Sequence, residues 1–219
     1  MENYIIDFEN YKKEIKGITI LDYISIKIKQ GYIYGFVGRN GSGKSMLFKA
    51  ICGLIKPTSG FVRVNGKVIG KDADFPDDIG ILIESPGFLE HISGFDNLKY
   101  LASIQNKIND KEIKEAMSIV GLDQNDKRAV KKYSLGMKQR LGIAQAIMEN
   151  PSLVILDEPM NGLDKQGVED IRNLILNLKK NGVTILLASH NPDDIKLLCD
   201  KVYEIDKGRI ESELIGGVD

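Results

Sequence analysis

The sequence predicts an α/β protein whose central sheet is mostly parallel and covered by helices on both faces. Three almost uninterrupted apolar runs, at 32–37, 153–156 and 183–188, are typical of strands buried on both sides. Helical patterns separate such runs, and strands alternating with helices favour parallel order. The length of 219 residues suits one large domain with an ample core.

The first part of the chain contains several short strand patterns. Ile18 to Ile28 alternates apolar and polar residues, which predicts a half-buried antiparallel strand. A helix is expected from Lys44 to Leu54, because the segment 56–60 contains proline and glycine and breaks the pattern. Further strands are expected at Phe61 to Val64 and at Ile79 to Ile83.

The middle of the chain differs, because Asp96 to about Asn150 contains no convincing strand pattern. Ile113, Met117 and Val120 form one apolar helix face before a stop at Gly121. We therefore expect a mostly helical insertion.

Strands and helices alternate again after this insertion. The strand at 153–156 is followed by a helix that Asn181-Gly182 ends, and then by the strand at 183–188. A last strand is expected at Val202 to Ile205. The apolar stripe of the helix consists of Ile171, Leu174, Ile175 and Leu178.

The composition excludes several classes of protein. The formal net charge of −1 argues against a general nucleic-acid-binding surface. No apolar run approaches the roughly 20 residues of a membrane helix, and the first ten residues lack the apolar core of an export signal. Cys52 and Cys199 lie among apolar residues and are expected to be buried thiols in a reducing compartment.

A phosphate-binding motif follows the strand at 32–37. Gly38 to Ser45 has the pattern G-x-x-x-x-G-K-S between a buried strand and a helix. Glycines let backbone N–H groups close around phosphate oxygens, and the helix N-terminus favours the same anion. In this pattern Lys44 bridges the β- and γ-phosphates of a nucleotide, and the Ser45 hydroxyl binds Mg²⁺.

Two carboxylates end the strand at 153–156. Asp157 and Glu158 follow it directly, at the edge of an open α/β sheet where ligands bind. Alone, this pair would indicate no more than a solvated turn. Beside a phosphate loop, Asp157 is expected to hold Mg²⁺ and Glu158 to polarise an attacking water.

Three further segments complete a family resemblance. Tyr133 to Arg140 (YSLGMKQR) resembles a signature usually written LSGGQ, Asn161 to Asp164 resembles a D-loop, and Ser189-His190 resembles a switch histidine. Over essentially its whole length the chain thus resembles the ATPase subunit of ABC transporters.

The resemblance implies a P-loop NTPase (RecA-like) core with an N-terminal antiparallel β subdomain and an inserted α-helical subdomain. It implies one ABC ATPase domain at 1–219, with the core and β subdomain at about 1–83 and 151–219 and the helical subdomain at 84–150. The helical part would contain the equivalent of the Q-loop and the signature.

The resemblance also implies ATP and Mg²⁺ as ligands. Catalysis is assigned to Lys44, Glu158 and His190, and metal binding to Ser45, Asp157 and Glu84. The expected nucleotide-binding residues are Gly38, Arg39, Asn40, Gly41, Ser42, Gly43, Lys44, Ser45, Met46, Glu84, Ser134 and Gly136.

In the family, the signature faces the phosphate loop of a second subunit. The resemblance therefore implies an ATP-dependent head-to-tail homodimer or heterodimer, in which Ser134 and Gly136 contact the partner's nucleotide. Considered alone, Ser134 would be an ordinary helix N-cap.

The chain departs from the family pattern at three places. Glu84 stands where the family usually has glutamine, and with the following segment 86–89 it resembles a subgroup that serves lantibiotic and bacitracin-type peptide resistance or export. The alternative is that Glu84 is a neutral replacement in a chain that exports another cargo. Ile15 stands at the usual position of an adenine-stacking aromatic residue, and the nearby Tyr11 is out of register. The third departure is in the signature, where Leu135 and Met137 replace the commoner glycine and glutamine.

The expected function is that of an ATP-hydrolysing, energy-coupling transporter subunit, with an exported peptide antibiotic or another hydrophobic or peptide cargo. Its expected partners are a second ATPase subunit and a transmembrane permease, without nucleic acid. Its expected location is the cytoplasmic face of the cell membrane. The alternatives are a soluble ABC ATPase acting on nucleic acid or the ribosome, and a nucleotide-binding regulator without turnover. The sequence leaves the cargo, the transport direction and the base specificity open.

Overall fold

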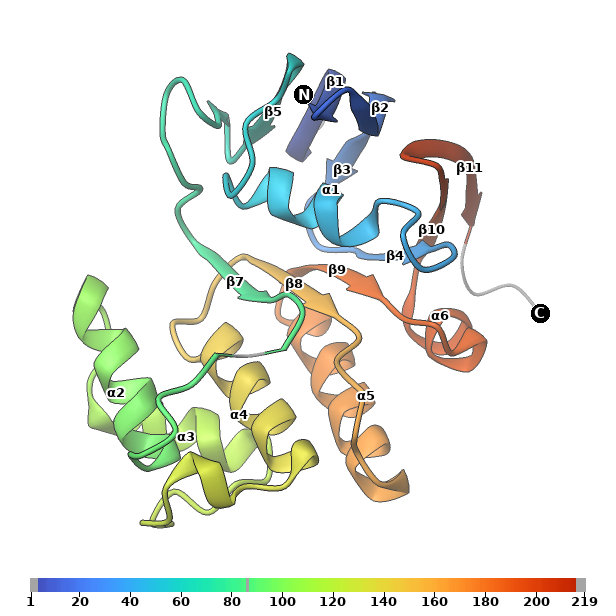
Figure 1. Ribbon diagram of the computed structural model, residues 1–219. Helices are drawn as coiled ribbons and strands as arrows, with labels where there is room; N and C mark the ends of the chain where they lie inside the picture. Colours follow the sequence, from blue (N-terminus) through green and yellow to red (C-terminus); the bar gives the residue numbers. More distant parts are fainter. Residues whose placement is uncertain (1–3, 86, 216–219) are drawn as a thin grey trace.

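The strands form two sheets, as Figure 1 shows. The computed structural model describes residues 4–85 and 87–215. Within these residues, a six-stranded sheet has the order β11-β10-β4-β9-β8-β7, and a second sheet has the order β2-β1-β5-β6, with β3 paired to β1. The expected domain limits at 1 and 219, and Pro86 of the segment 86–89, lie outside the described residues.

The six-stranded sheet confirms the predicted parallel core. Every neighbouring pair in it is parallel except β10 and β11. The five strands predicted for this sheet agree with the observed ones to within one residue at each end, whereas β11 was not predicted. The strands are β4 (Ile33–Val37), β7 (Ile79–Leu82), β8 (Leu153–Asp157), β9 (Thr184–Ala188), β10 (Lys201–Asp206) and β11 (Arg209–Ile215).

The sheet is covered on both faces, because successive residues of each apolar strand point into two different hydrophobic cores. In β8, Leu153 and Ile155 pack into the core shared with α1 (Lys44–Ile51) and the second sheet. Val154 and Leu156 pack on the opposite side, in the core shared with the helices α4 (Leu135–Ile147), α5 (Lys165–Lys180) and α6 (Pro192–Leu198). The phosphate-loop helix α1 therefore lies between the two sheets (Figure 1).

The second sheet corrects one prediction. The stretch 18–28 is two strands, because Tyr23 has a left-handed φ of 51° and the chain changes pairing beyond it. β2 pairs with one end of β1 and β3 with the other. The sequence did not predict β1, whose alternation is interrupted by register shifts and by Asn10 at φ 47°. The strands are β1 (Tyr4–Ile15), β2 (Ile18–Ile24), β3 (Lys27–Lys29), β5 (Ser59–Val64) and β6 (Lys67–Val68).

The middle of the chain is helical, as expected. It contains α2 (Gly94–Gln105), α3 (Asp110–Ile119), a short 3-10 helix at Val130–Lys132 and α4. Polar caps start these helices, since Ser93, Asn109 and Ser134 each accept a hydrogen bond from a backbone N–H of the first turn. The boundaries of a helical subdomain at 84 and 150 remain a prediction.

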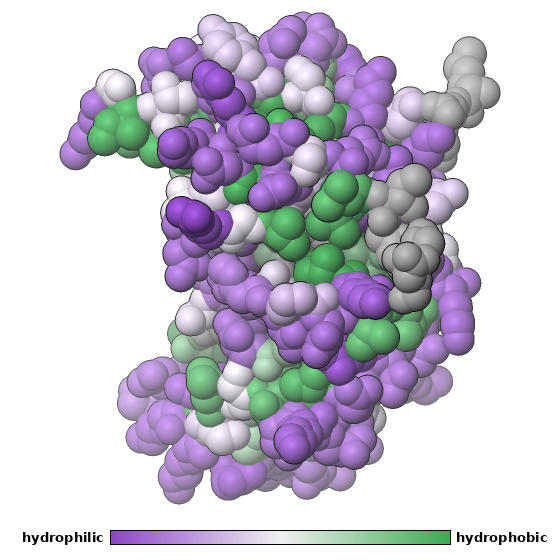
Figure 2. Space-filling view, turned by 90° about the vertical axis from the view of Figure 1, so that its right-hand side faces the viewer, coloured by the Kyte–Doolittle hydropathy of each residue, from purple (hydrophilic) through white to green (hydrophobic). Residues whose placement is uncertain are grey.

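The surface in Figure 2 is mostly hydrophilic, with hydrophobic side chains gathered across the middle of that face. Of the helices in the described part of the chain, none has the length and apolarity needed to cross a membrane. Cys52 and Cys199 are both buried free thiols, which confirms their expected burial, while the reducing compartment stays a prediction. Burial raises the pKa of each thiol to about 12.

Candidate active site

The carboxyl ends of four parallel strands open into one cavity of about 810 Å³. The phosphate loop follows β4, Glu84 follows β7, Asp157 ends β8, and His190 follows β9. Ligands bind at this edge of open α/β sheets. The cavity is lined by Ile15, Ile20, Asn40, Gly41, Ser42, Gly43, Lys44, Ser45, Met46, Glu84, Ser85, Leu135, Gln139, Asp157, Glu158, Asn161 and His190.

The phosphate loop has the geometry of an anion cradle. At Gly38 an added Cβ would lie 2.2 Å from the Ile205 carbonyl oxygen, so a side chain does not fit there. Lys44 is buried, and its Nζ donates to the carbonyl oxygens of Gly38 at 2.6 Å and Arg39 at 3.2 Å. Gly38 and Arg39 thus orient the lysine, although they do not line the cavity.

Two features of the loop fit a bound phosphate. The Ser42 Oγ is buried and has no hydrogen-bond partner in the described structure. A buried hydroxyl without a partner is costly, and a phosphate oxygen would satisfy it. Burial lowers the pKa of Lys44, while Asp157 and Glu158 oppose that shift. A phosphate group would replace the lost hydration of the ammonium with direct charge pairing.

Ser45 and Asp157 form a pair that fits Mg²⁺. The Ser45 Oγ donates to Asp157 Oδ2 at 2.7 Å, so a hydroxyl and a carboxylate already meet at one point of the cavity. Mg²⁺ is usually bound by one or two protein oxygens together with substrate phosphates and water. Accordingly, the described residues contain no cluster of three or more His, Cys, Asp or Glu side chains that would hold a metal alone.

Glu158 and His190 meet beside this pair. The His190 backbone N donates to Glu158 Oε2 at 3.3 Å. The His190 Nε2 lies 3.3 Å from Glu158 Oε1 but lacks hydrogen-bond geometry, so the buried Oε1 has no hydrogen-bond partner among the described residues. Burial raises the pKa of Glu158, and His190 partly opposes the shift. A carboxylate with a raised pKa and an oxygen that lacks a hydrogen-bond partner suits a general base.

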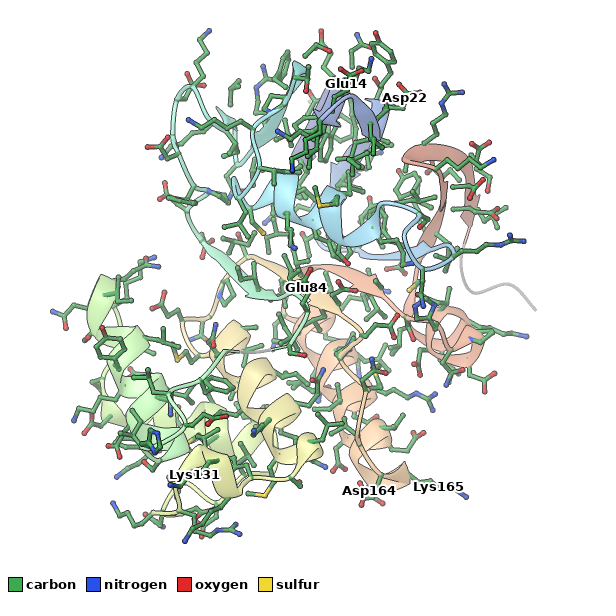
Figure 3. The ribbon with its side chains drawn as sticks, in the orientation of Figure 1. Glu14, Asp22, Glu84, Lys131, Asp164 and Lys165 are labelled. Carbon is green, nitrogen blue, oxygen red and sulfur yellow. The ribbon has the colours of Figure 1, made fainter. Side chains whose placement is uncertain are left out.

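Glu84 lies at the end of β7, near the centre of the view in Figure 3. It has a left-handed φ of 61° and lines the cavity. Its Oε1 accepts from the Lys49 Nζ at 2.6 Å, on the helix that follows the phosphate loop. A glutamine at this position would have no charge to pair with Lys49.

The end of the cavity beyond the phosphate loop is aliphatic. Ile15 and Ile20 line it, from the two strands of the first hairpin. Tyr11 is fully buried, and its hydroxyl donates to the Ile55 carbonyl oxygen at 3.1 Å. It is therefore a core residue that does not line the cavity.

Ser134 and Gly136 lie outside the phosphate-loop cavity. They line a separate depression together with Gly162 and Asp164. The Ser134 Oγ caps α4 by accepting from the Met137 N at 3.1 Å. In Figure 3, Lys131 and Asp164 mark this end of the molecule, away from α1. Within one chain, Ser134 and Gly136 therefore do not share the cavity of the phosphate loop, although Leu135 and Gln139 of the same segment line it.

Several lining residues were not assigned to the site from the sequence. Ile20 and Ser85 belong to no motif, whereas Leu135, Gln139 and Asn161 belong to the signature and D-loop segments without having been given a role in the site. Gln139 is buried in register with Ile143 and Ala146 on α4. The sequence signal that could have identified Gln139 is that it is a polar residue in line with the apolar face of its helix. Ile20 and Ser85 carry no comparable sequence signal, since the fold alone brings them to the cavity.

The chain matches the family model described as "ABC transporter" over residues 21–161. It is 44% identical to the uncharacterized ABC transporter ATP-binding protein YybJ of Bacillus subtilis (strain 168), over 95% of each chain. It is 38% identical to the bacitracin transport ATP-binding protein BcrA of Enterococcus faecalis, covering 96% of this chain and 69% of that protein. The lantibiotic transport ATP-binding protein SrtF of Streptococcus pyogenes is 37% identical, with coverage of 94% and 89%.

A solved structure shows the same fold. A dimeric ATP-binding cassette in a post-hydrolysis state, bound to ADP and Pi, superposes with a TM-score of 0.86. The match covers 96% of this chain and 98% of that one, at 22% identity. The P-loop NTPase fold with its β and helical parts, expected from the sequence, is thereby confirmed.

Proposed function

Because this chain belongs to the ABC transporter family of ATP-binding proteins, we propose that its ATP hydrolysis drives export of a peptide antibiotic or another hydrophobic or peptide cargo. The observation that carries the hydrolytic part is a single cavity that brings Lys44, Asp157, Glu158 and His190 together. A regulator without turnover would not need the last two in this arrangement.

Each residue has a role that its position supports. The phosphate loop and Lys44 bind the β- and γ-phosphates of ATP, and Ser45 and Asp157 hold Mg²⁺. Mg²⁺, when bound, neutralises charge on the phosphates. Glu158 accepts a proton from the attacking water, and His190 orients that water and the γ-phosphate. Glu84 is a further candidate oxygen ligand, and its Oε1 is paired with Lys49.

The site is proposed to need a second subunit. Ser134 and Gly136 line a different depression from the phosphate loop, so they are available to a nucleotide held by another chain. A symmetric pair of subunits would give each site both parts. Closing and reopening of this pair would drive a transmembrane permease at the cytoplasmic face of the membrane.

The cargo class rests on the relatives. BcrA and SrtF are described as bacitracin and lantibiotic transport proteins, and Glu84 fits the subgroup that the sequence indicated. Neither BcrA nor SrtF is described as acting on nucleic acid or the ribosome, and the net charge of −1 does not favour such a partner.

The proposal is tested by purifying the tagged chain from detergent-solubilised membranes of cells that encode it. We expect a multi-helix membrane protein to copurify, and loss of the chain to lower resistance to bacitracin or to a lantibiotic. A Lys44→Ala chain should still copurify without restoring resistance. Recovery of the ATPase alone, with unchanged resistance, would contradict the export role. ATP hydrolysis stimulated by RNA or ribosomes would favour the alternative.

A further inference from the structure

A buried amide faces the turn that carries Glu158. Gln139 lies on α4, is 7% exposed and lines the cavity. Its Nε2 donates to the Glu158 carbonyl oxygen at 3.0 Å. A buried amide that lost this partner would be left unsatisfied, so the bond fixes the side chain and the peptide together.

The turn at Glu158 needs such support. Glu158 has a left-handed φ of 53°, although the residue before a proline, here Pro159, is ordinarily extended. A non-glycine residue keeps this conformation only where its surroundings hold it. The holding bonds are Glu158 N to Ala188 O at 2.9 Å, Asn161 N to Glu158 O at 3.2 Å, and the bond from Gln139.

These three bonds come from different parts of the fold. Ala188 belongs to the adjacent strand β9, and Asn161 to the same turn, so both bonds form as the sheet edge forms. Gln139 alone among the three belongs to α4, whose N-terminus is the segment 134–136. The side chain therefore joins the signature helix to the turn that directs the Glu158 carboxylate.

We propose that Gln139 is a positioning residue for ATP hydrolysis. It holds the peptide after Glu158 in its left-handed turn and keeps the carboxylate directed into the cavity. The inference rests on the proposed role of Glu158 as the base, and it assigns to Gln139 no contact with the nucleotide.

The first test is Gln139→Met, which preserves the length of the side chain and removes the donor. Losing one buried hydrogen bond corresponds to a loss of about 3- to 10-fold in kcat. The dissociation constant for ATP should stay unchanged, because the phosphate loop is untouched. Gln145→Met is the matched control, since Gln145 lies on the same helix but outside the cavity, and it should keep kcat. Equal losses in both variants, or weaker ATP binding without a loss of kcat, would overturn the proposal.

The second test combines Gln139→Met with Glu158→Gln. If Gln139 acts only through the Glu158 carboxylate, the double variant should have the same residual turnover as Glu158→Gln alone. A further loss of several-fold would show a general structural role and overturn the proposal. Gln139→Glu, which keeps polarity and size but does not donate when ionised, replaces Gln139→Met if that variant fails to fold, with the same outcomes.

The two proposals fail in different ways. Full turnover in Glu158→Gln alone would overturn the base role of Glu158 and the positioning role of Gln139 with it. Abolished turnover in Glu158→Gln, together with unchanged kcat in Gln139→Met, would overturn the positioning role only.

Discussion

At the scale of single residues, Glu158 decides whether bound ATP is cleaved. In Glu158→Gln the side chain keeps its shape but no longer accepts the proton of the attacking water. We expect kcat to fall by about 10²- to 10⁴-fold. ATP should still bind, because Lys44 and the phosphate loop are unchanged, and the ATP-bound dimer should accumulate. Steady-state hydrolysis and size-exclusion chromatography with ATP measure both effects, and undiminished turnover would remove Glu158 from the base role.

The same carboxylate should make stability depend on pH. Burial raises the pKa of Glu158 in the folded state above its ordinary value of 4.5. At pH values between 4.5 and the folded-state pKa, the folded state therefore binds more protons than the unfolded state. Raising the pH through this window therefore lowers the free energy of unfolding. Glu158→Gln should be more stable than the natural chain at about pH 8, with the difference shrinking toward about pH 5. Chemical unfolding at several pH values measures this difference, and a pH-independent one would contradict the argument.

Ile15 should influence the affinity of the site for the purine base of the nucleotide. The cavity end formed by Ile15 and Ile20 offers aliphatic contact only, whereas an aromatic ring adds stacking worth about 0.5–1.5 kcal/mol. Ile15→Tyr should therefore lower the dissociation constants of ATP and GTP by about 2- to 10-fold, with little change in kcat. Ile18→Tyr is the control, since Ile18 is in the same hairpin but 65% exposed and outside the cavity. Titration calorimetry distinguishes the two, and equal affinities in both variants would exclude Ile15 from the base site.

At the scale of elements, a buried ion pair joins α5 to α6 beside the His190 loop. Asp194 is 1% exposed and accepts from Arg172 Nε at 2.9 Å and from the Ser189 Oγ at 2.9 Å. Asp194→Ala would remove the buried partner of Arg172 and leave it only the exposed Glu169, so we expect the free energy of unfolding to fall by about 1.5–3 kcal/mol. Glu169 also pairs with Arg172 but is exposed, and Glu169→Ala should cost less than about 1 kcal/mol. Denaturant unfolding checks both values, and similar losses would contradict a buried network.

The elements also show which parts of the site a sequence can predict. The phosphate loop, Asp157, Glu158 and His190 follow apolar strands, and local periodicity locates strand ends. Lys49–Glu84 and Gln139–Glu158 join residues that the chain separates by 35 and 19 positions, so only the fold reveals them. β1 was missed for a related reason, since its bulges interrupt the alternation on which strand prediction depends.

At the scale of the whole molecule, the proposed site is divided between two depressions. The phosphate loop lines one, while Ser134 and Gly136 line the other. A two-fold symmetric pair places each part of one subunit opposite the complementary part of its partner, so both sites form at once. Two variants that damage different parts should therefore rescue each other, whereas two that damage the same part should not.

This gives a mixing experiment with Lys44→Ala and Ser134→Asp. Each variant alone should be inactive, because Lys44→Ala loses its phosphate contact and the aspartate repels a nucleotide phosphate while still capping α4. In a mixed dimer one site combines both defects and the other has none. An equal mixture should then recover about a quarter of the natural activity if pairing is random and the sites act independently.

Lys44→Ala mixed with Glu158→Gln is the matched control. Both defects lie on the phosphate-loop side, so every site keeps one defect and the mixture should stay inactive. Activity absent from both mixtures would mean that each chain completes its own site.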